Sequence, residues 1–224
     1  MFVHGLGGSA LNWTDLMGLL SDPTAEPPLA GEALDLPGFG FSPPPPDADY
    51  SLDARVGAVI ALIDKRGTGP VHLVGNSLGG AITTRVAARR PDLVKTLTLI
   101  SPALPDLRPR PLPLRLAVVA MPGVGRWLVT KMQTIPPERR AETSAAELYV
   151  DTNRIQPERR AEAIAEMIRR DGLGYSVDAL LFSARSLLTE YTRPGSASAH
   201  SDADPGRVYS VSSDRAEKSS ASTE

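Results

Sequence analysis

The sequence contains no cysteine, which excludes disulfide bonds, thiolate metal sites and a thiol nucleophile. Only three histidines occur, at positions 4, 72 and 200, and they are too scattered to suggest a metal cluster. No run of about 18 apolar residues exists, so we expect no membrane-spanning helix. The net charge of −2 provides no strong field for nucleic acid or anionic membrane. We therefore expect no metal, no cofactor and no nucleic-acid partner.

We also expect no leader sequence. Met1-Phe2-Val3 runs directly into a glycine-rich motif, with no charged lead or apolar segment before it. We therefore expect a cytoplasmic protein. The 224 residues, 42% hydrophobic and 22% charged, suit one globular domain or a domain with an insertion.

The first 101 residues alternate short apolar runs with amphipathic segments. This alternation is typical of an α/β fold with a mostly parallel sheet. Ser51 begins a predicted helix that the stretch Gly67-Thr68-Gly69-Pro70 ends. The predicted strands cover residues 2–3, 33–36, 71–74 and 95–100, and the predicted helices cover residues 10–20, 51–66 and 81–90.

Beyond residue 101 the pattern changes to helices, at 114–132 with a break near Pro122-Gly123, and at 137–150, 157–171 and 175–189. Pro-Glu-Arg-Arg-Ala-Glu occurs twice, as an internal repeat or as two independent helix starts. Nine of the residues 195–224 are serine, and little apolar bulk accompanies them. We divide the chain into a core (1–101), a helical insertion (102–194) and a disordered tail (195–224).

The segment Gly75-Asn76-Ser77-Leu78-Gly79-Gly80 follows an apolar strand and precedes a helix. This is the context in which G-x-S-x-G forms a sharp turn that exposes a nucleophilic serine. The turn holds Ser77 in a sparsely populated backbone conformation that costs about 1–3 kcal/mol. Gly75 and Gly79 remove the side chains that would collide where strand and helix close up.

Three motifs in order give the chain its resemblance to the α/β-hydrolase superfamily. His4-Gly5-Leu6-Gly7-Gly8 is similar to the oxyanion loop of that family, Asp35 to Ser42 is similar to its D-x-P-G-x-G-x-S loop, and Gly75 to Gly80 is similar to its nucleophile elbow. The resemblance covers residues 1–193. It implies a three-layer α/β sandwich, here a partial core, with a helical cap over residues 102–194. It also implies that the sheet order runs 33–36, 2–3, 71–74, 95–100.

The resemblance implies roles for these residues. Ser77 is the expected nucleophile, and the backbone N–H groups of Leu6 and Leu78 are the expected oxyanion donors. His4 and Gly5 support the loop structurally, and we expect Asp35 to brace its own turn. His72, at the start of a strand, is expected to be packed or half-exposed.

The acid and histidine of the family's triad have no clear counterpart, so the base and acid are unknown. His200 is the only histidine after the elbow, in the segment predicted to be disordered, and Asp106 has no histidine to orient. The family also has strands before the oxyanion loop. The sequence therefore resembles a hydrolase truncated at both ends, with a frameshift near Gly195 as one origin. Edge strands left without neighbours invite self-association.

The function implied is hydrolysis of a small or medium acyl or ester substrate through an acyl-enzyme on Ser77, impaired here because triad members are missing. Epoxide hydrolases and dehalogenases of this fold use aspartate at the elbow and are disfavoured. The alternative is a non-catalytic pseudohydrolase that binds an apolar ligand or a protein partner. Gly5-Leu6-Gly7-Gly8 lacks the spacing of a phosphate-binding loop, so nucleotide binding is set aside.

Overall fold

A computed structural model describes residues 1–104, 117–192 and 208–211 of the chain. Its centre is one sheet in the order β2-β1-β3-β4-β5, and every pair of neighbouring strands is parallel. This confirms the predicted α/β class with a parallel sheet and the order of its first four strands. The strands are β1 (Phe2–Val3), β2 (Ala33–Leu34), β3 (Val71–Asn76), β4 (Val94–Ile100) and β5 (Val208–Val211).

β5 differs from the sequence prediction. The sequence predicts disorder throughout 195–224, but residues 208–211 form a strand in register with β4, with Leu97 opposite Val208 and Ile100 opposite Val211. The long edge of β4 offers unpaired backbone groups, and pairing satisfies them although the segment itself has little apolar bulk. The rest of the predicted tail lies outside the described residues.

Capping residues mark the start and the end of the helix at 52–66. The Ser51 hydroxyl accepts a hydrogen bond from the N–H of Ala54, and Gly67 ends the same helix with φ +62°. The helix predicted over 10–20 begins instead as a 3₁₀ turn. The bounds are η1 (Ala10–Trp13), α1 (Thr14–Ser21), α2 (Leu52–Arg66), α3 (Leu78–Arg89) and η2 (Pro91–Leu93).

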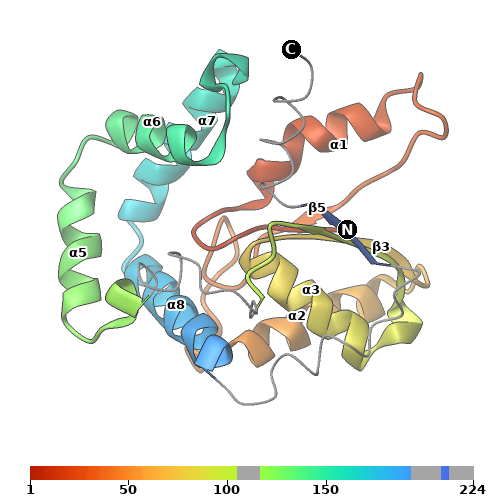
Figure 1. Cartoon of the computed structure of the whole chain (residues 1–224), viewed down its shortest axis with the longest axis horizontal. Helices are drawn as coiled ribbons and strands as arrows, with labels where there is room; N and C mark the ends of the chain where they lie inside the picture. The colour runs from red at the N-terminus through yellow and green to blue at the C-terminus, as the bar shows by residue number, and fades with distance from the viewer. Residues whose placement is uncertain (105–116, 193–207, 212–224) are drawn as a thin grey trace, which may run out of the picture.

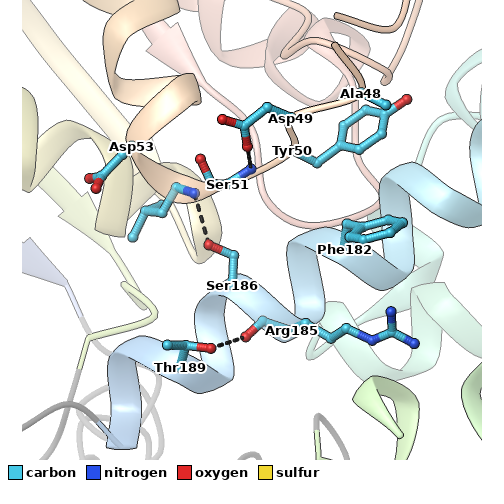
Figure 2. A pocket seen from close by; sticks show the side chains of 10 residues that line it. Ala48, Asp49, Tyr50, Ser51, Asp53, Phe182, Arg185, Ser186 and Thr189 are labelled. Carbon is cyan, nitrogen blue, oxygen red and sulfur yellow. Dashed lines mark hydrogen bonds between the residues drawn. The ribbon is translucent and has the colours of Figure 1, made fainter. Parts of the chain in front are cut away.

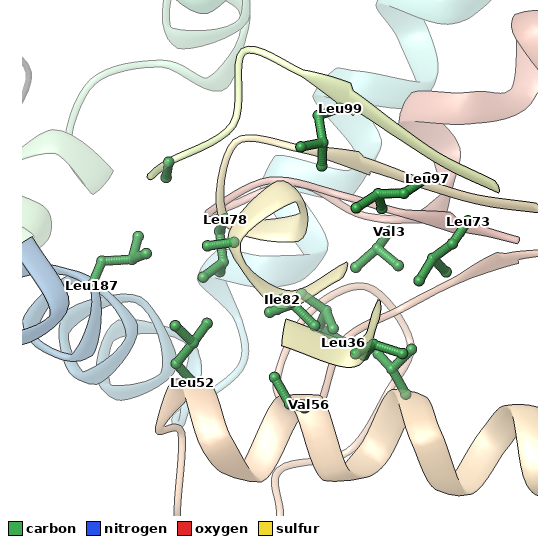
Figure 3. Packing of buried hydrophobic residues seen from close by; sticks show 14 of the residues in the cluster. Val3, Leu36, Leu52, Val56, Leu73, Leu78, Ile82, Leu97, Leu99 and Leu187 are labelled. Atoms are coloured by element: carbon green, nitrogen blue, oxygen red, sulfur yellow. The ribbon is translucent and has the colours of Figure 1, made fainter. Parts of the chain in front are cut away.

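The sheet is covered on both faces. Figure 1 shows α2 and α3 on one side of it and α1 on the other. The main core lies between the sheet and the pair α2 and α3, where Leu73 and Leu97 of the strands meet Val56 and Ile82 of the helices (Figure 3). Burial of such side chains supplies about 1.5–3 kcal/mol each and fixes α3 against the strands that flank the elbow.

Residues 117–192 are largely helical, as predicted, while the predicted helix start at residue 114 lies outside the described residues. The repeated hexapeptide marks two helix starts, because α6 and α7 both begin at the proline, which suits a first helical turn. The break at Pro122-Gly123 also holds, since the next helix begins at Val124. The three-part division of the chain stays a prediction. The bounds are α5 (Val124–Gln133), α6 (Pro137–Leu148), η3 (Thr152–Arg154), α7 (Pro157–Asp171) and α8 (Ser176–Thr192).

Candidate active site

Ser77 alone makes the turn between β3 and α3. Its φ of +50° and ψ of −115° lie in a region that non-glycine residues rarely occupy. The surrounding backbone holds this conformation: the N–H of Ser77 donates to the carbonyl of Ile100 at 3.1 Å, and its carbonyl accepts from the N–H of Ala103 at 2.9 Å. The strained strand-to-helix turn predicted from the sequence is therefore confirmed.

Two glycines allow this turn to close. A Cβ atom at Gly75 would lie 2.3 Å from Oγ1 of Thr83, and a Cβ atom at Gly79 would lie 2.2 Å from the carbonyl oxygen of Val3. Real Cβ atoms do not approach so closely. The first turn of α3 thus packs directly against the backbone of β1 and the end of β3, as the spacing of the motif predicts.

The glycine loop lies beside Ser77. The N–H of Gly8 donates to the carbonyl of Gly5 at 3.1 Å, and Gly7 has φ +74°, so residues 5–8 form a turn that needs glycine at its third position. A Cβ atom at Gly5 would lie 3.2 Å from the Cβ atom of Ser77. Leu6 therefore directly follows Gly5, whose backbone lies against the side chain of Ser77. Leu78 is the first residue of α3, so its N–H has no acceptor within the helix.

His4 is fully buried and both of its ring nitrogens are engaged. Nε2 accepts a hydrogen bond from the N–H of Leu36 at 3.0 Å, which leaves the proton on Nδ1 to be donated to the carbonyl of Gly5 at 2.7 Å. The ring also packs edge-on against Phe39, with centroids 5.6 Å apart. His4 therefore joins the glycine loop to the chain beyond β2, a partner that the sequence did not indicate. Burial lowers the pKa of His4.

This burial predicts a pH dependence of stability. Below about pH 6.5 the unfolded chain binds a proton at His4 that the folded chain resists, so the free energy of unfolding falls as pH falls. We expect a loss of about 1 kcal/mol between pH 6.5 and 5.5. Urea denaturation at a series of pH values measures it. His4→Gln should flatten this slope, with His72→Gln as the control for loss of one imidazole. Equal slopes in His4→Gln and the unaltered chain would refute the assignment.

Asp35 braces its own loop and a second one. Its Oδ2 accepts from the N–H of Phe41 at 2.9 Å, which confirms the prediction, and its Oδ1 accepts from the N–H of Ala10 at 2.7 Å. A Cβ atom at Gly40 would lie 2.0 Å from the Asp35 carboxyl carbon. The link to Ala10 was not visible in the sequence, because 25 residues separate the two groups.

Neither histidine in the described part of the chain is placed to act as a base for Ser77, because His4 is engaged through both ring nitrogens and His72 lies far along β3. His72 is exposed at the start of β3, with Nδ1 2.7 Å from Oγ1 of Thr96, at the opposite end of the strand from Ser77. Asp106 and His200 lie outside the described residues. Across residues 1–104, 117–192 and 208–211, no group of three or more acidic or histidine side chains is arranged to hold a metal ion, and no helix is long and apolar enough to cross a bilayer.

A cavity of about 460 Å³ lies away from the elbow, between the start of α2 and α8 (Figure 2). At its wall the rings of Tyr50 and Phe182 stack with centroids 6.3 Å apart, and the hydroxyl of Ser186 accepts from the N–H of Leu52 at 2.8 Å. None of its lining residues belongs to the elbow or the glycine loop. No motif in the sequence pointed to this cavity, and it is not the site that Ser77 defines.

Comparison with known proteins agrees with this geometry. The model of the alpha/beta hydrolase fold family matches residues 1–203, and the chain belongs to this family. Lipase LipV of Mycobacterium tuberculosis is 41% identical over 103 residues, which are 46% of this chain and 36% of LipV. The 2-hydroxymuconate semialdehyde hydrolase of Pseudomonas sp. CF600 is 34% identical over 107 residues, 46% of this chain and 36% of that enzyme.

The fold also matches solved structures. The haloalkane dehalogenase AncHLD2 superimposes with a TM-score of 0.66 at 25% identity, over 90% of this chain and 66% of that one. The chain therefore spans about a third of the length of these curated relatives and about two thirds of this structural neighbour. Other relatives matched in sequence include a lipase of Moraxella sp. and acetyltransferase components of acetoin cleaving systems.

Proposed function

We propose that this chain carries the nucleophile and oxyanion site of a serine hydrolase that acts on a small or medium acyl or ester substrate. The observation that carries the proposal is the backbone of Ser77, at φ +50° and ψ −115° between β3 and α3. A protein has no structural reason to retain a strained serine at a turn where glycine would be relaxed. Such strain is typical of sites where it presents a reacting group.

In the proposed reaction the Ser77 hydroxyl attacks the substrate carbonyl and loses its proton to a base, and the carbonyl oxygen becomes an oxyanion. The N–H groups of Leu6 and Leu78 are suited to stabilise it. One comes from the glycine turn that touches Ser77 and the other from the free first turn of α3. Loss of one such donor typically costs about 3–4 kcal/mol of barrier. Collapse expels the alcohol with a proton and leaves the acyl group on Ser77, which water then removes.

We expect this chain to turn over slowly. Both ring nitrogens of His4 are hydrogen-bonded, to Leu36 and to Gly5. His72 is exposed near the start of β3, at the end of the strand away from Ser77. Without a base, the oxyanion site and binding leave an acceleration of about 10³–10⁴ over water.

The helical segment 117–192 is proposed as a cap over the substrate. Self-association through the outer strands β2 and β5 is a further proposal.

A fluorophosphonate probe tests the nucleophile. We expect slow labelling that reaches one probe per chain, mapped to Ser77 by mass spectrometry and absent from Ser77→Ala. Hydrolysis of a p-nitrophenyl ester should be weak and should also depend on Ser77. Labelling that is unchanged in Ser77→Ala would reject the nucleophile, and Ser77-dependent turnover of about 1–10³ s⁻¹ would reject the impairment.

A second candidate is a pseudohydrolase that binds an apolar ligand or a protein partner without chemistry. The engagement of His4 with Leu36 and Gly5 favours it, because a buried histidine with both ring nitrogens hydrogen-bonded is unavailable as a base. A folded sample that binds a fatty-acid probe but takes no label at Ser77 supports this candidate.

A further inference from the structure

The last turn of α7 contacts two loops of the core, the glycine loop at residues 4–8 and the loop at residues 35–42. Arg170 donates from Nη1 to the carbonyl of Gly7 at 2.6 Å, and its neighbour Arg169 donates to the carbonyl of Gly40. The guanidinium of Arg169 also lies 4.4 Å from the ring centroid of Phe41. These bonds span 163 and 129 residues of sequence. Two consecutive arginines thus connect the helical segment to two different loops of the core.

The carbonyl that Arg170 binds belongs to the turn that carries Leu6. One backbone hydrogen bond, from Gly8 to Gly5, closes this turn. Gly7 sits at φ +74° and, having no side chain, is conformationally free, so the turn has little intrinsic stiffness. Arg170 restricts rotation of the peptide between Gly7 and Gly8 by donating to the Gly7 carbonyl. His4 restricts rotation of the peptide between Gly5 and Leu6 by donating to the Gly5 carbonyl. The N–H of Leu6 belongs to the same peptide as the Gly5 carbonyl, and Arg170 holds the other end of the turn.

Arg170 can donate to the Gly7 carbonyl because the acidic residues near it in sequence accept hydrogen bonds from other arginines. Asp171 accepts from Arg140 at 3.2 Å, and Glu166 accepts from Arg169 at 2.9 Å. Within the part of the chain that the structure describes, Arg170 forms no ion pair of its own, and burial lowers its pKa. A desolvated guanidinium bound to a carbonyl makes a stronger hydrogen bond than a neutral donor would.

We propose that Arg170 is a positioning residue that couples α7 to the oxyanion turn, so that the Leu6 N–H is aimed at the Ser77 site only while α7 is docked. This inference rests on the proposed function of Ser77 and Leu6. It makes the helical segment part of the catalytic geometry as well as a cover. A change in the position of α7 is thereby transmitted to the oxyanion site through one hydrogen bond.

The test compares Arg170→Met, Arg170→Lys and the matched control Arg169→Met in the full chain. Hydrogen exchange of the peptide over residues 3–9, the rate of fluorophosphonate labelling at Ser77 and the urea midpoint are measured together. In Arg170→Met we expect exchange over residues 3–9 to rise about tenfold and labelling to slow about 10- to 100-fold, because the oxyanion donor is misplaced. The urea midpoint should stay close to that of the unaltered chain. Arg170→Lys, which keeps a cationic donor, should recover part of both effects.

The control separates positioning from general loosening. Arg169→Met removes the neighbouring contact of the same helix, so exchange should rise around Gly40 while residues 3–9 keep their protection. Similar losses in both methionine variants, or unchanged exchange over residues 3–9 in Arg170→Met, would overturn the inference. If the unaltered chain takes no label at Ser77, the proposed function fails, and the exchange measurement still decides whether Arg170 holds the turn.

Discussion

Replacing Gly79 with alanine should lower the free energy of unfolding by about 3 kcal/mol, because the new Cβ atom has no space. It would lie 2.2 Å from the carbonyl oxygen of Val3 and 2.7 Å from that of His4. Both atoms are backbone, and β1 is held between β2 and β3, so neither can move aside cheaply. Urea denaturation of the two proteins measures the difference.

Gly57→Ala is the matched control for this prediction. It is also a glycine-to-alanine change within a helix, but a Cβ atom at Gly57 meets nothing within 4 Å. We expect it to raise the free energy of unfolding by about 0.5–1 kcal/mol, since alanine restricts the unfolded chain and suits a helix. Destabilisation of similar size in both variants would contradict the steric explanation.

Arg55→Ala should cost about 3 kcal/mol or more, because it empties a buried site and leaves several polar groups unpaired. Arg55 is 1% exposed. Its Nη1 donates to the carbonyl of Tyr50 at 3.1 Å and to the hydroxyl of Ser183 at 2.6 Å. Its guanidinium lies 5.0 Å from the ring centroid of Phe39. Burial lowers the pKa of Arg55 to about 10, and its hydrogen bonds go to two backbone carbonyls and one hydroxyl, not to a carboxylate.

Two further variants identify the source of this loss. Arg55→Met keeps most of the volume and should give an intermediate urea midpoint. Arg66→Ala removes an arginine of the same helix whose partner is the exposed Glu32, and its midpoint should hardly change. The explanation is wrong if Arg55→Ala unfolds at the same urea concentration as Arg66→Ala.

The role of Arg55 illustrates what the helical pattern of α2 left undetected. Leu52, Val56 and Val59 mark the buried face of this helix, and position 55 lies on the same face, three residues after Leu52. The periodicity therefore contained a signal that Arg55 is buried. Its partner Ser183 is 128 residues away, however, and nothing local indicates that α8 returns to this point.

Local chemistry made most of the elbow predictable. The strand before Ser77, the helix after it, and the glycines on either side each depend on neighbours within a few residues. The caps of α2 at Ser51 and Gly67 are similarly local. β5 could not be predicted in this way, because its residues form a strand only when the edge of β4 is present to pair with them.

The sequence by itself thus determined the parallel α/β class, the order of the first four strands, and the position of Ser77 between a strand and a helix. The class and the position of Ser77 follow from steric limits on the backbone and from apolar periodicity, which act over short stretches of chain, whereas the strand order was implied by the resemblance to the α/β-hydrolase superfamily. The tertiary structure alone decided that His4 binds Leu36, that Asp35 binds Ala10 and that Arg170 binds Gly7. Such pairs are made by packing of whole elements against one another, and 25 to 163 residues of intervening chain carry no local record of them.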